Sequence, residues 1–307
     1  MKLPGPRTVC RTATALAVMA VASSAMAADV DNRPLTIAKD TSWHLRLPKD
    51  EKVAYKGMVS YDAAGVNSAQ ILYPAPNALG FLAAVFTHGA IVESQKKSEK
   101  ERLQQEADKV LAPFEAILND YRHRELMQRA IEKMGAGEKM RLVPADDAGG
   151  EWVVVSIPSF TMMQDQSAII LENAVALFPP DSKEPAYRNA VRVVSRTQEG
   201  ADLTAFWSAN GGVKLKEESA GLLAHSLEIA MADAATAPDV LGPQKTFRFR
   251  EGREERIERA NLVNERCDRM IIKTLRGWLM SVPARASSAA SADDSCRAAA
   301  DNAKPAG

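Results

Sequence analysis

The sequence predicts an α+β protein in which helices pack against a mostly antiparallel sheet. Runs of β-branched residues are concentrated between residues 152 and 196, and segments with helical periodicity lie on both sides of them. The 307 residues are 46% hydrophobic and 25% charged. That composition is typical of a folded globular chain and excludes disorder throughout.

The first 27 residues have the three parts of a secretory signal peptide. Lys2, Arg7 and Arg11 precede an apolar run over residues 13–22, and alanine occupies positions −3 and −1 of a cleavage site that ends at Ala27. The apolar run is about half as long as a bilayer span, which disfavours a membrane anchor. We therefore expect cleavage near Ala27 and a periplasmic or secreted mature chain without a transmembrane span.

Residues 28–76 are predicted to form an N-terminal extended segment. Alternation of apolar and polar residues over 43–47, and less regularly over 53–59, is typical of edge or hairpin strands. A core domain is expected over residues 77–236. It begins with a helix of about 35 residues that Asn77 caps.

The first half of this predicted helix is unusual because it is apolar nearly all round. It starts at Leu79, ends at Val92 and contains several glycines and alanines. The run is too short to span a bilayer, and its small residues allow another backbone to approach closely. One interpretation is burial in the chain's own core. The other is an oligomer contact or a membrane-associated contact.

Pro113 should end this helix, because proline removes a helical hydrogen bond. The next helix is predicted from Pro113 to about Met134, with a kink or a second break at residues 122–125, where its apolar face shifts. Strands are then predicted over residues 152–157, 168–178 and 191–196.

Residues 203–207 are predicted to complete a hairpin with the strand at 191–196, through a connection at 199–202. A helix is expected from Gly212 to about Ala235. The apolar stripe that should dock it on the sheet consists of Leu215, Leu222, Ser226, Ile229 and Ala230.

A linker and an amphipathic helix are predicted over residues 237–282, followed by a disordered Ala/Ser-rich tail over 283–307. Apolar residues at helical spacing place this helix at about 253–281. Basic residues crowd its polar side and are candidates for a surface that contacts an acidic protein or an anionic membrane. They are Arg259, Arg266, Arg269, Lys273 and Arg276.

The net charge of zero is the sum of unlike parts. The leader contributes +3, residues 28–243 contribute −7 (23 basic, 30 acidic), and residues 244–307 contribute +4 (13 basic, 9 acidic). A chain without a marked basic excess is not expected to bind nucleic acid. The basic C-terminal region is where we expect a partner to bind.

Two cysteines, Cys267 and Cys296, remain after the leader is removed. An oxidising compartment makes them candidates for one disulfide, which would close a loop of about 30 residues and contribute roughly 3–4 kcal/mol. The alternative is a buried, inert Cys267 and an exposed Cys296.

No motif points to catalysis, to a cofactor or to a metal. The four histidines lack metal-ligand spacing, and phosphate-binding and nucleophile-elbow motifs are absent. His225 and Ser226 are helix neighbours that point about 100° apart, so they cannot pair as base and nucleophile. We expect an exported, non-enzymatic protein that acts through protein or envelope-surface contacts. The alternative is an enzyme or small-ligand-binding protein whose site is assembled from scattered residues.

Overall fold

The computed structural model describes residues 34–38, 40–59, 94–135, 137–147, 150–236, 241–266 and 269–284. All of them belong to one compact unit, Asp31–Gly307. The predicted signal peptide, the run from Leu79 to Val92, both candidate disulfide cysteines and the tail beyond residue 284 lie outside the described residues.

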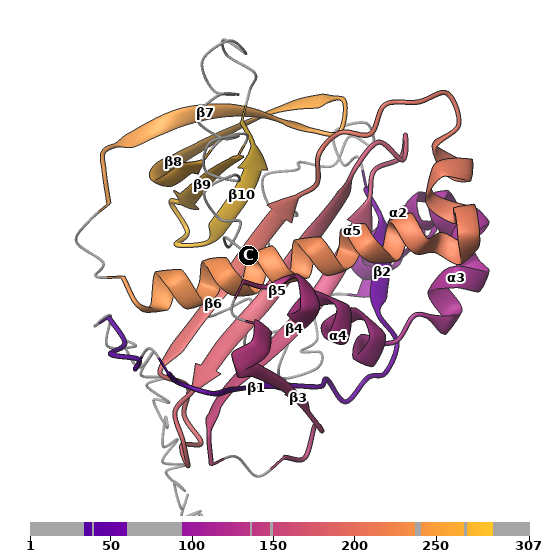
Figure 1. The fold of residues 1–307 in the computed structure, drawn as a ribbon. Helices are drawn as coiled ribbons and strands as arrows, with labels where there is room; N and C mark the ends of the chain where they lie inside the picture. The colour runs from indigo at the N-terminus through magenta and orange to yellow at the C-terminus, as the bar shows by residue number, and fades with distance from the viewer. Residues whose placement is uncertain are drawn as a thin grey trace, which may run out of the picture. The chain divides into compact units, whose positions relative to one another are not determined.

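Ten strands form one mixed sheet, and helices pack on it, so the chain has an α+β fold (Figure 1). The order across the sheet is β3-β1-β4-β5-β6-β10-β9-β8-β7, and β2 also pairs with β4. The strands are β1 (Trp43–Arg46), β2 (Ala54–Gly57), β3 (Met140–Val143), β4 (Trp152–Met162), β5 (Ile169–Phe178), β6 (Tyr187–Val194), β7 (Gln244–Glu251), β8 (Glu254–Arg266), β9 (Arg269–Thr274) and β10 (Leu279–Pro283).

The sheet is less antiparallel than the sequence predicts. From β4 to β6, and again from β7 to β10, neighbouring strands are antiparallel. In contrast, β1 runs parallel to β3 and β4, β2 runs parallel to β4, and β10 runs parallel to β6. Because β1 lies between two strands, its Trp43 and Leu45 are buried, and the prediction of an edge or hairpin strand there is wrong.

The helical segments are α2 (Ser94–Ala107), the 3₁₀ segment η2 (Asp108–Phe114), α3 (Glu115–Asp120), α4 (His123–Lys133), the short η3 (Gly137–Lys139) and α5 (Leu203–Ala234). Pro113 lies within η2, so the regular helix ends before it. Between α3 and α4 the backbone is extended at Tyr121 and Arg122. The predicted interruption near residues 122–125 is therefore confirmed.

The predicted hairpin strand at residues 203–207 is wrong, because these residues form the first turns of α5. The Asp202 carboxylate accepts a hydrogen bond of 2.8 Å from the backbone N–H of Ala205, which caps the helix. A kink follows at residues 209–212, where Gly211 and Gly212 have φ of 69° and 79°. The helix then continues to Ala234, as the sequence predicts for this second part.

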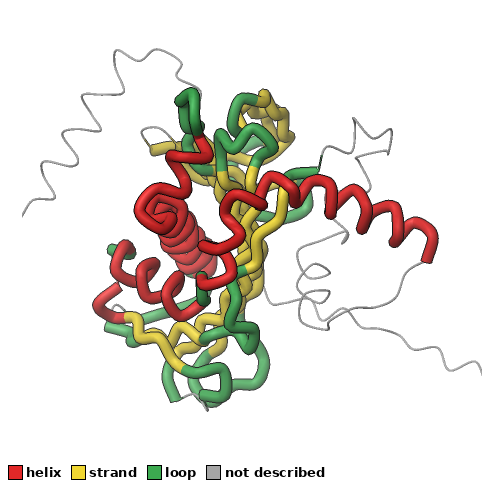
Figure 2. Tube along the Cα trace, turned by 90° about the vertical axis from the view of Figure 1, so that its right-hand side faces the viewer, coloured by secondary structure: helices red, strands yellow, loops and turns green. Residues whose placement is uncertain are grey.

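The long helix α5 docks on one face of the central strands. In the view turned by 90° it is seen along its axis on one side of the sheet (Figure 2). All five residues of its predicted apolar stripe are buried, and the stripe packs into the larger of two hydrophobic clusters. Ser226 completes a buried polar chain, since Asn173 of β5 donates to its Oγ at 2.9 Å and accepts from Ser156 of β4 at 2.8 Å.

The predicted C-terminal amphipathic helix is wrong, because residues 254–283 form three strands. Ile257 and Val263, which the helical stripe would bury, are exposed. Ala260, Ile272 and Met280 are buried instead in a second hydrophobic cluster. Glycines with positive φ at residues 252 and 277 allow the tight turns that reverse the chain. Pairing between neighbouring strands therefore outweighed the helical spacing of the apolar residues.

His123 at the start of α4 gives a prediction for the pH dependence of stability. It is 5% exposed, and burial lowers its pKa, against opposing contributions from Asp50 and from a hydrogen bond with the Lys52 backbone. The folded chain therefore binds this proton less readily than the unfolded chain. The stabilisation is complete above the unfolded pKa of about 6.5 and is lost as pH falls toward the folded value.

We therefore expect the free energy of unfolding to fall more between about pH 7.5 and pH 5.5 for the wild type than for His123→Gln. Urea unfolding curves at the two pH values measure this difference. Burial raises the pKa of Glu218 and of Glu258, and both groups favour the folded state as pH falls, so only the comparison between the two proteins isolates His123. Equal losses in both proteins would refute the assignment.

Candidate interaction surface

The outer face of β7 and β8 combines arginine and apolar side chains. Cross-strand register pairs Thr246 with Arg259, Arg248 with Ile257, and Arg250 with Glu255. Since side chains alternate between the two faces of a strand, these six residues share one face. We call this set of six residues the outer face of β7–β8.

The apolar residue at the centre of this face is strongly exposed. Ile257 is 56% exposed, and it lies directly across from Arg248, whose side chain is also 56% exposed. Among the described residues, five large hydrophobic side chains are exposed, and four of them lie between residues 241 and 275. Exposed apolar side chains are thus concentrated in the C-terminal strands and their turns.

The outer face of β7–β8 carries a net positive charge. It contains three arginines and a single carboxylate, Glu255. Arg248 donates to Glu255 at 3.0 Å, but an exposed pair of this kind contributes only about 0–1 kcal/mol. Arg250 and Arg259 are exposed on either side of that pair. The face therefore attracts negative charge.

The opposite face of β7 and β8 is turned inward. Phe249 of β7 and Ala260 of β8 are buried in the second hydrophobic cluster, with Phe247 packed against it. The inner face of the hairpin thus packs against the second hydrophobic cluster, and the outer face exposes arginine and isoleucine side chains.

A buried ionic clasp holds the end of β7 against the central sheet. Arg192 of β6 donates to Glu251 of β7 and to Glu172 of β5, both at 2.9 Å. Lys56 of β2 reaches Glu172 at 3.2 Å, and Arg256 of β8 lies 3.3 Å from Glu251. Burial alone would raise the pKa of Glu172, but Lys56 and Arg192 outweigh burial and hold that pKa below its usual value. The clasp therefore links three strands of the sheet, β2, β5 and β6, to the β7–β8 hairpin.

The basic residues that the sequence singles out do not lie together on one helix face, and that part of the prediction is wrong. Arg259 lies on the outer face of β7–β8, and Arg276 is exposed in the turn between β9 and β10. Arg269 points inward and donates to Ser281 and to the Val194 carbonyl, while Lys273 pairs with Asp233 of α5 at 3.2 Å. The Arg266 side chain is outside the described residues.

Arg248, Arg250 and Ile257 were missed as surface residues. A signal for the first two is present in the sequence, because residues 246–250 read Thr-Phe-Arg-Phe-Arg. Alternation of aromatic and basic residues with period two is typical of a strand with one buried face and one basic face. Ile257 has no such signal, since its exposure depends on register with β7.

A polar cluster joins α5 to β10. His225 Nε2 lies 2.9 Å from Ser281 Oγ, and Arg269 Nε donates to the same oxygen at 2.9 Å. Ser281 Oγ accepts from Arg269 and can accept a second hydrogen bond, so the donor in the His225 contact follows the histidine tautomer. This resembles a nucleophile and its base, but Ser281 is fully buried. The described contacts therefore assign the cluster to holding α5 on the sheet.

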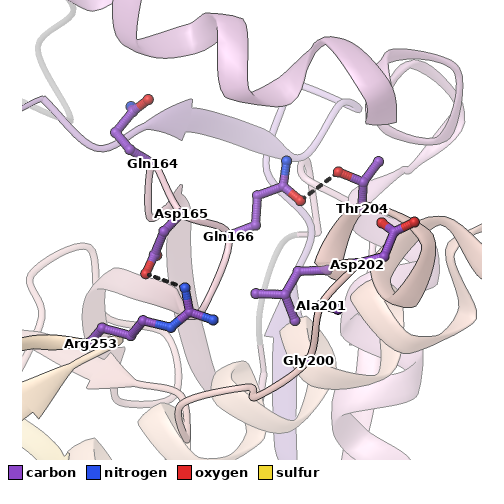
Figure 3. A pocket seen from close by; sticks show the side chains of 9 residues that line it. Gln164, Asp165, Gln166, Gly200, Ala201, Asp202, Thr204 and Arg253 are labelled. Carbon is purple, nitrogen blue, oxygen red and sulfur yellow. Dashed lines mark hydrogen bonds and ion pairs between the residues drawn. The ribbon is translucent and has the colours of Figure 1, made fainter.

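A small hollow of about 270 Å³ lies beside the start of α5 (Figure 3). Most of its polar side chains already have partners within the protein. Thr204 donates to Gln166 at 2.8 Å, Arg253 lies 3.7 Å from Asp165, and Asp202 caps α5. Most polar groups in the hollow are thus used within the protein.

Groups of histidine, cysteine, aspartate or glutamate that could hold a metal ion are absent from the residues that the structure describes. Within the same ranges, no helix is both long and apolar enough to cross a bilayer. No protein-family model matches the chain, and no curated protein matches it in sequence.

Proposed function

We propose that the chain is an exported, non-enzymatic protein that binds an acidic protein partner through the outer face of β7–β8. The observation that carries this proposal is the register that places exposed Ile257 directly beside Arg248, with Arg250 and Arg259 on either side. Export is proposed from the leader sequence alone.

Charged side chains at a sheet edge also protect it against aggregation, so arginines alone would support no binding role. That protective role does not explain Ile257. An exposed β-branched side chain between arginines adds apolar contact area, which favours association. Arginine combined with a central apolar residue is typical of protein interfaces. An acidic partner fits the sign of the charge, and the partner's apolar side chains fit Ile257.

The sequence also left open an enzyme or a small-ligand-binding protein. The best-placed residues for that role are Ser281 and His225, but Ser281 is fully buried. Most polar groups around the hollow near α5 already have partners within the protein. These observations favour the binding protein over the alternative.

The experiment places a photoreactive amino acid at Ile257 of the full chain, produced in its native cells. We expect an adduct with a specific acidic protein, identified by mass spectrometry. The adduct should be lost when Arg248, Arg250 and Arg259 are all replaced by glutamate. It should persist in the matched control, in which the exposed Lys109, Arg141 and Lys214 are replaced by glutamate.

A flotation assay with phosphatidylglycerol vesicles separates a membrane surface from a protein partner. Binding of the mature chain to these vesicles, without an adduct to any protein, would overturn the proposal in favour of a membrane role. An adduct that forms equally in both triple variants would also overturn it, because contact would then not depend on the outer face of β7–β8. Thermal unfolding of each variant confirms that the chain remains folded.

A further inference from the structure

We infer that the acidic partner contributes an extended segment that pairs with the open edge of β7 and adds a strand to the sheet. This inference depends on the proposed function and specifies how the partner is held. It starts from the position of β7 as the last strand of the sheet.

The outer edge of β7 has free backbone groups within the part of the chain that the structure describes. β7 pairs with β8 on one side, and no described strand pairs with its other side. In an antiparallel ladder, alternate residues direct both N–H and C=O to the same side. About half of the residues of β7 therefore direct these groups away from β8, where an extended peptide can bind them.

The exposed part of this edge is basic. Gln244, Lys245, Thr246 and Arg248 are all exposed at its start, and Arg250 follows. The one acidic residue of β7 is Glu251, which is 4% exposed and is held by Arg192 and Arg256. Glu251 therefore does not offset the positive charge that an incoming strand meets.

Charge also excludes a second copy of this chain as the favoured occupant. Antiparallel pairing of β7 with its own copy, centred on Arg248, would place two Arg248 side chains directly opposite each other. Like charges in such cross-strand positions are destabilising. Glutamate or aspartate at the same positions would instead form opposite-charge pairs with Arg248 and Arg250.

The two faces of the edge also predict the pattern of the incoming strand. Arg248 and Arg250 lie on the outer face, whereas the half-buried Phe247 lies on the inner face. Acidic side chains should therefore alternate with β-branched ones, since aromatic and β-branched residues form favourable cross-strand pairs. The clasp at Glu251 fixes the end of β7, so the edge is ordered before the partner binds.

The test uses the mature chain and a labelled eight-residue peptide that alternates glutamate and valine, with both termini capped. Fluorescence anisotropy measures binding. We expect the Arg248→Glu, Arg250→Glu double variant to bind at least tenfold more weakly. The Arg141→Glu, Lys214→Glu control should bind as the wild type does, and a peptide with lysine in place of glutamate should not bind.

Hydrogen exchange decides whether the bound peptide forms a strand. We expect slower exchange at alternate amides of β7 when the peptide is present. Two further peptides are N-methylated, one at the odd-numbered and the other at the even-numbered residues. We expect only one of these two peptides to lose binding. Binding without protection of β7 amides would overturn strand addition while leaving the proposed function intact. Absence of binding would overturn strand addition too, whereas the adduct at Ile257 tests the proposed function independently.

Discussion

Replacing Arg192 with methionine is expected to destabilise the protein by about 3–5 kcal/mol. The side chain is buried and bonded to both Glu172 and Glu251. Its removal takes away the buried cation between the two carboxylates and leaves only the more exposed Lys56 and Arg256 beside them, and losing one partner of a buried ion pair is costly. Urea unfolding followed by circular dichroism measures the change.

Two further variants separate loss of the charge from loss of packing. Arg188 lies four residues earlier on the same face of β6 and is 34% exposed, so Arg188→Met should cost less than about 1 kcal/mol. Adding Glu172→Gln and Glu251→Gln to Arg192→Met should recover much of the lost stability, because the two carboxylates that lost their buried cation are then uncharged. If the triple variant is no more stable than the single one, the loss does not come from charge.

Replacing Trp207 with alanine is expected to cost about 3–5 kcal/mol, the second of the two largest effects. The side chain is 1% exposed and belongs to the main hydrophobic cluster. Its Nε1–H also donates to the Gln166 carbonyl at 2.8 Å. Gln166 has φ of 58°, so this bond supports a left-handed backbone conformation that is unfavourable for a residue with a side chain.

The variant Trp207→Phe separates the two contributions, because it keeps most of the ring but lacks the N–H group. We expect it to lose only about 1–2 kcal/mol, the cost of one hydrogen bond and a small volume change. Both variants are measured by urea unfolding. Equal losses would show that the hydrogen bond to Gln166, and not the filled volume, accounts for the effect.

The central strands and the second part of α5 could be predicted from the sequence because local preference and burial agree there. Residues 152–157 are rich in β-branched residues and lie in a strand that is paired on both sides. The stripe from Leu215 to Ala230 has the same period as the helix that buries it. Where one residue pattern satisfies both the local conformational preference and the burial of apolar side chains, the helix or strand can be predicted from the sequence.

Elements were mispredicted where two patterns fit the same residues. Residues 203–207 have strand-forming side chains, but Asp202 supplies a helix cap and Trp207 fills the core from a helix. Over 254–283, apolar residues recur at helical spacing, yet pairing with β6 buries Leu279 and Ser281 on the side of α5. That pairing joins residues far apart in the chain, so no local window contains it.

The candidate surface was predicted in its charge but not in its arrangement. A positive C-terminal region follows directly from counting residues, and Arg259 was correctly placed on a surface. Which arginines stand beside Ile257 depends on the register of β7 and β8, and two of the predicted residues, Arg269 and Lys273, are bonded to groups on β10 and α5. Neither the register of β7 and β8 nor the partners of Arg269 and Lys273 can be predicted from the spacing of charged residues.

The parallel pairing of β10 with β6 has a consequence for synthesis of the chain. β10 follows the other nine strands of the sheet in the sequence, yet it lies in the middle of the sheet, between β6 and β9. Until it emerges, β6 has no neighbour on that side, and the loop to be closed spans about 85 residues. The sheet therefore cannot be completed before β10 has been made.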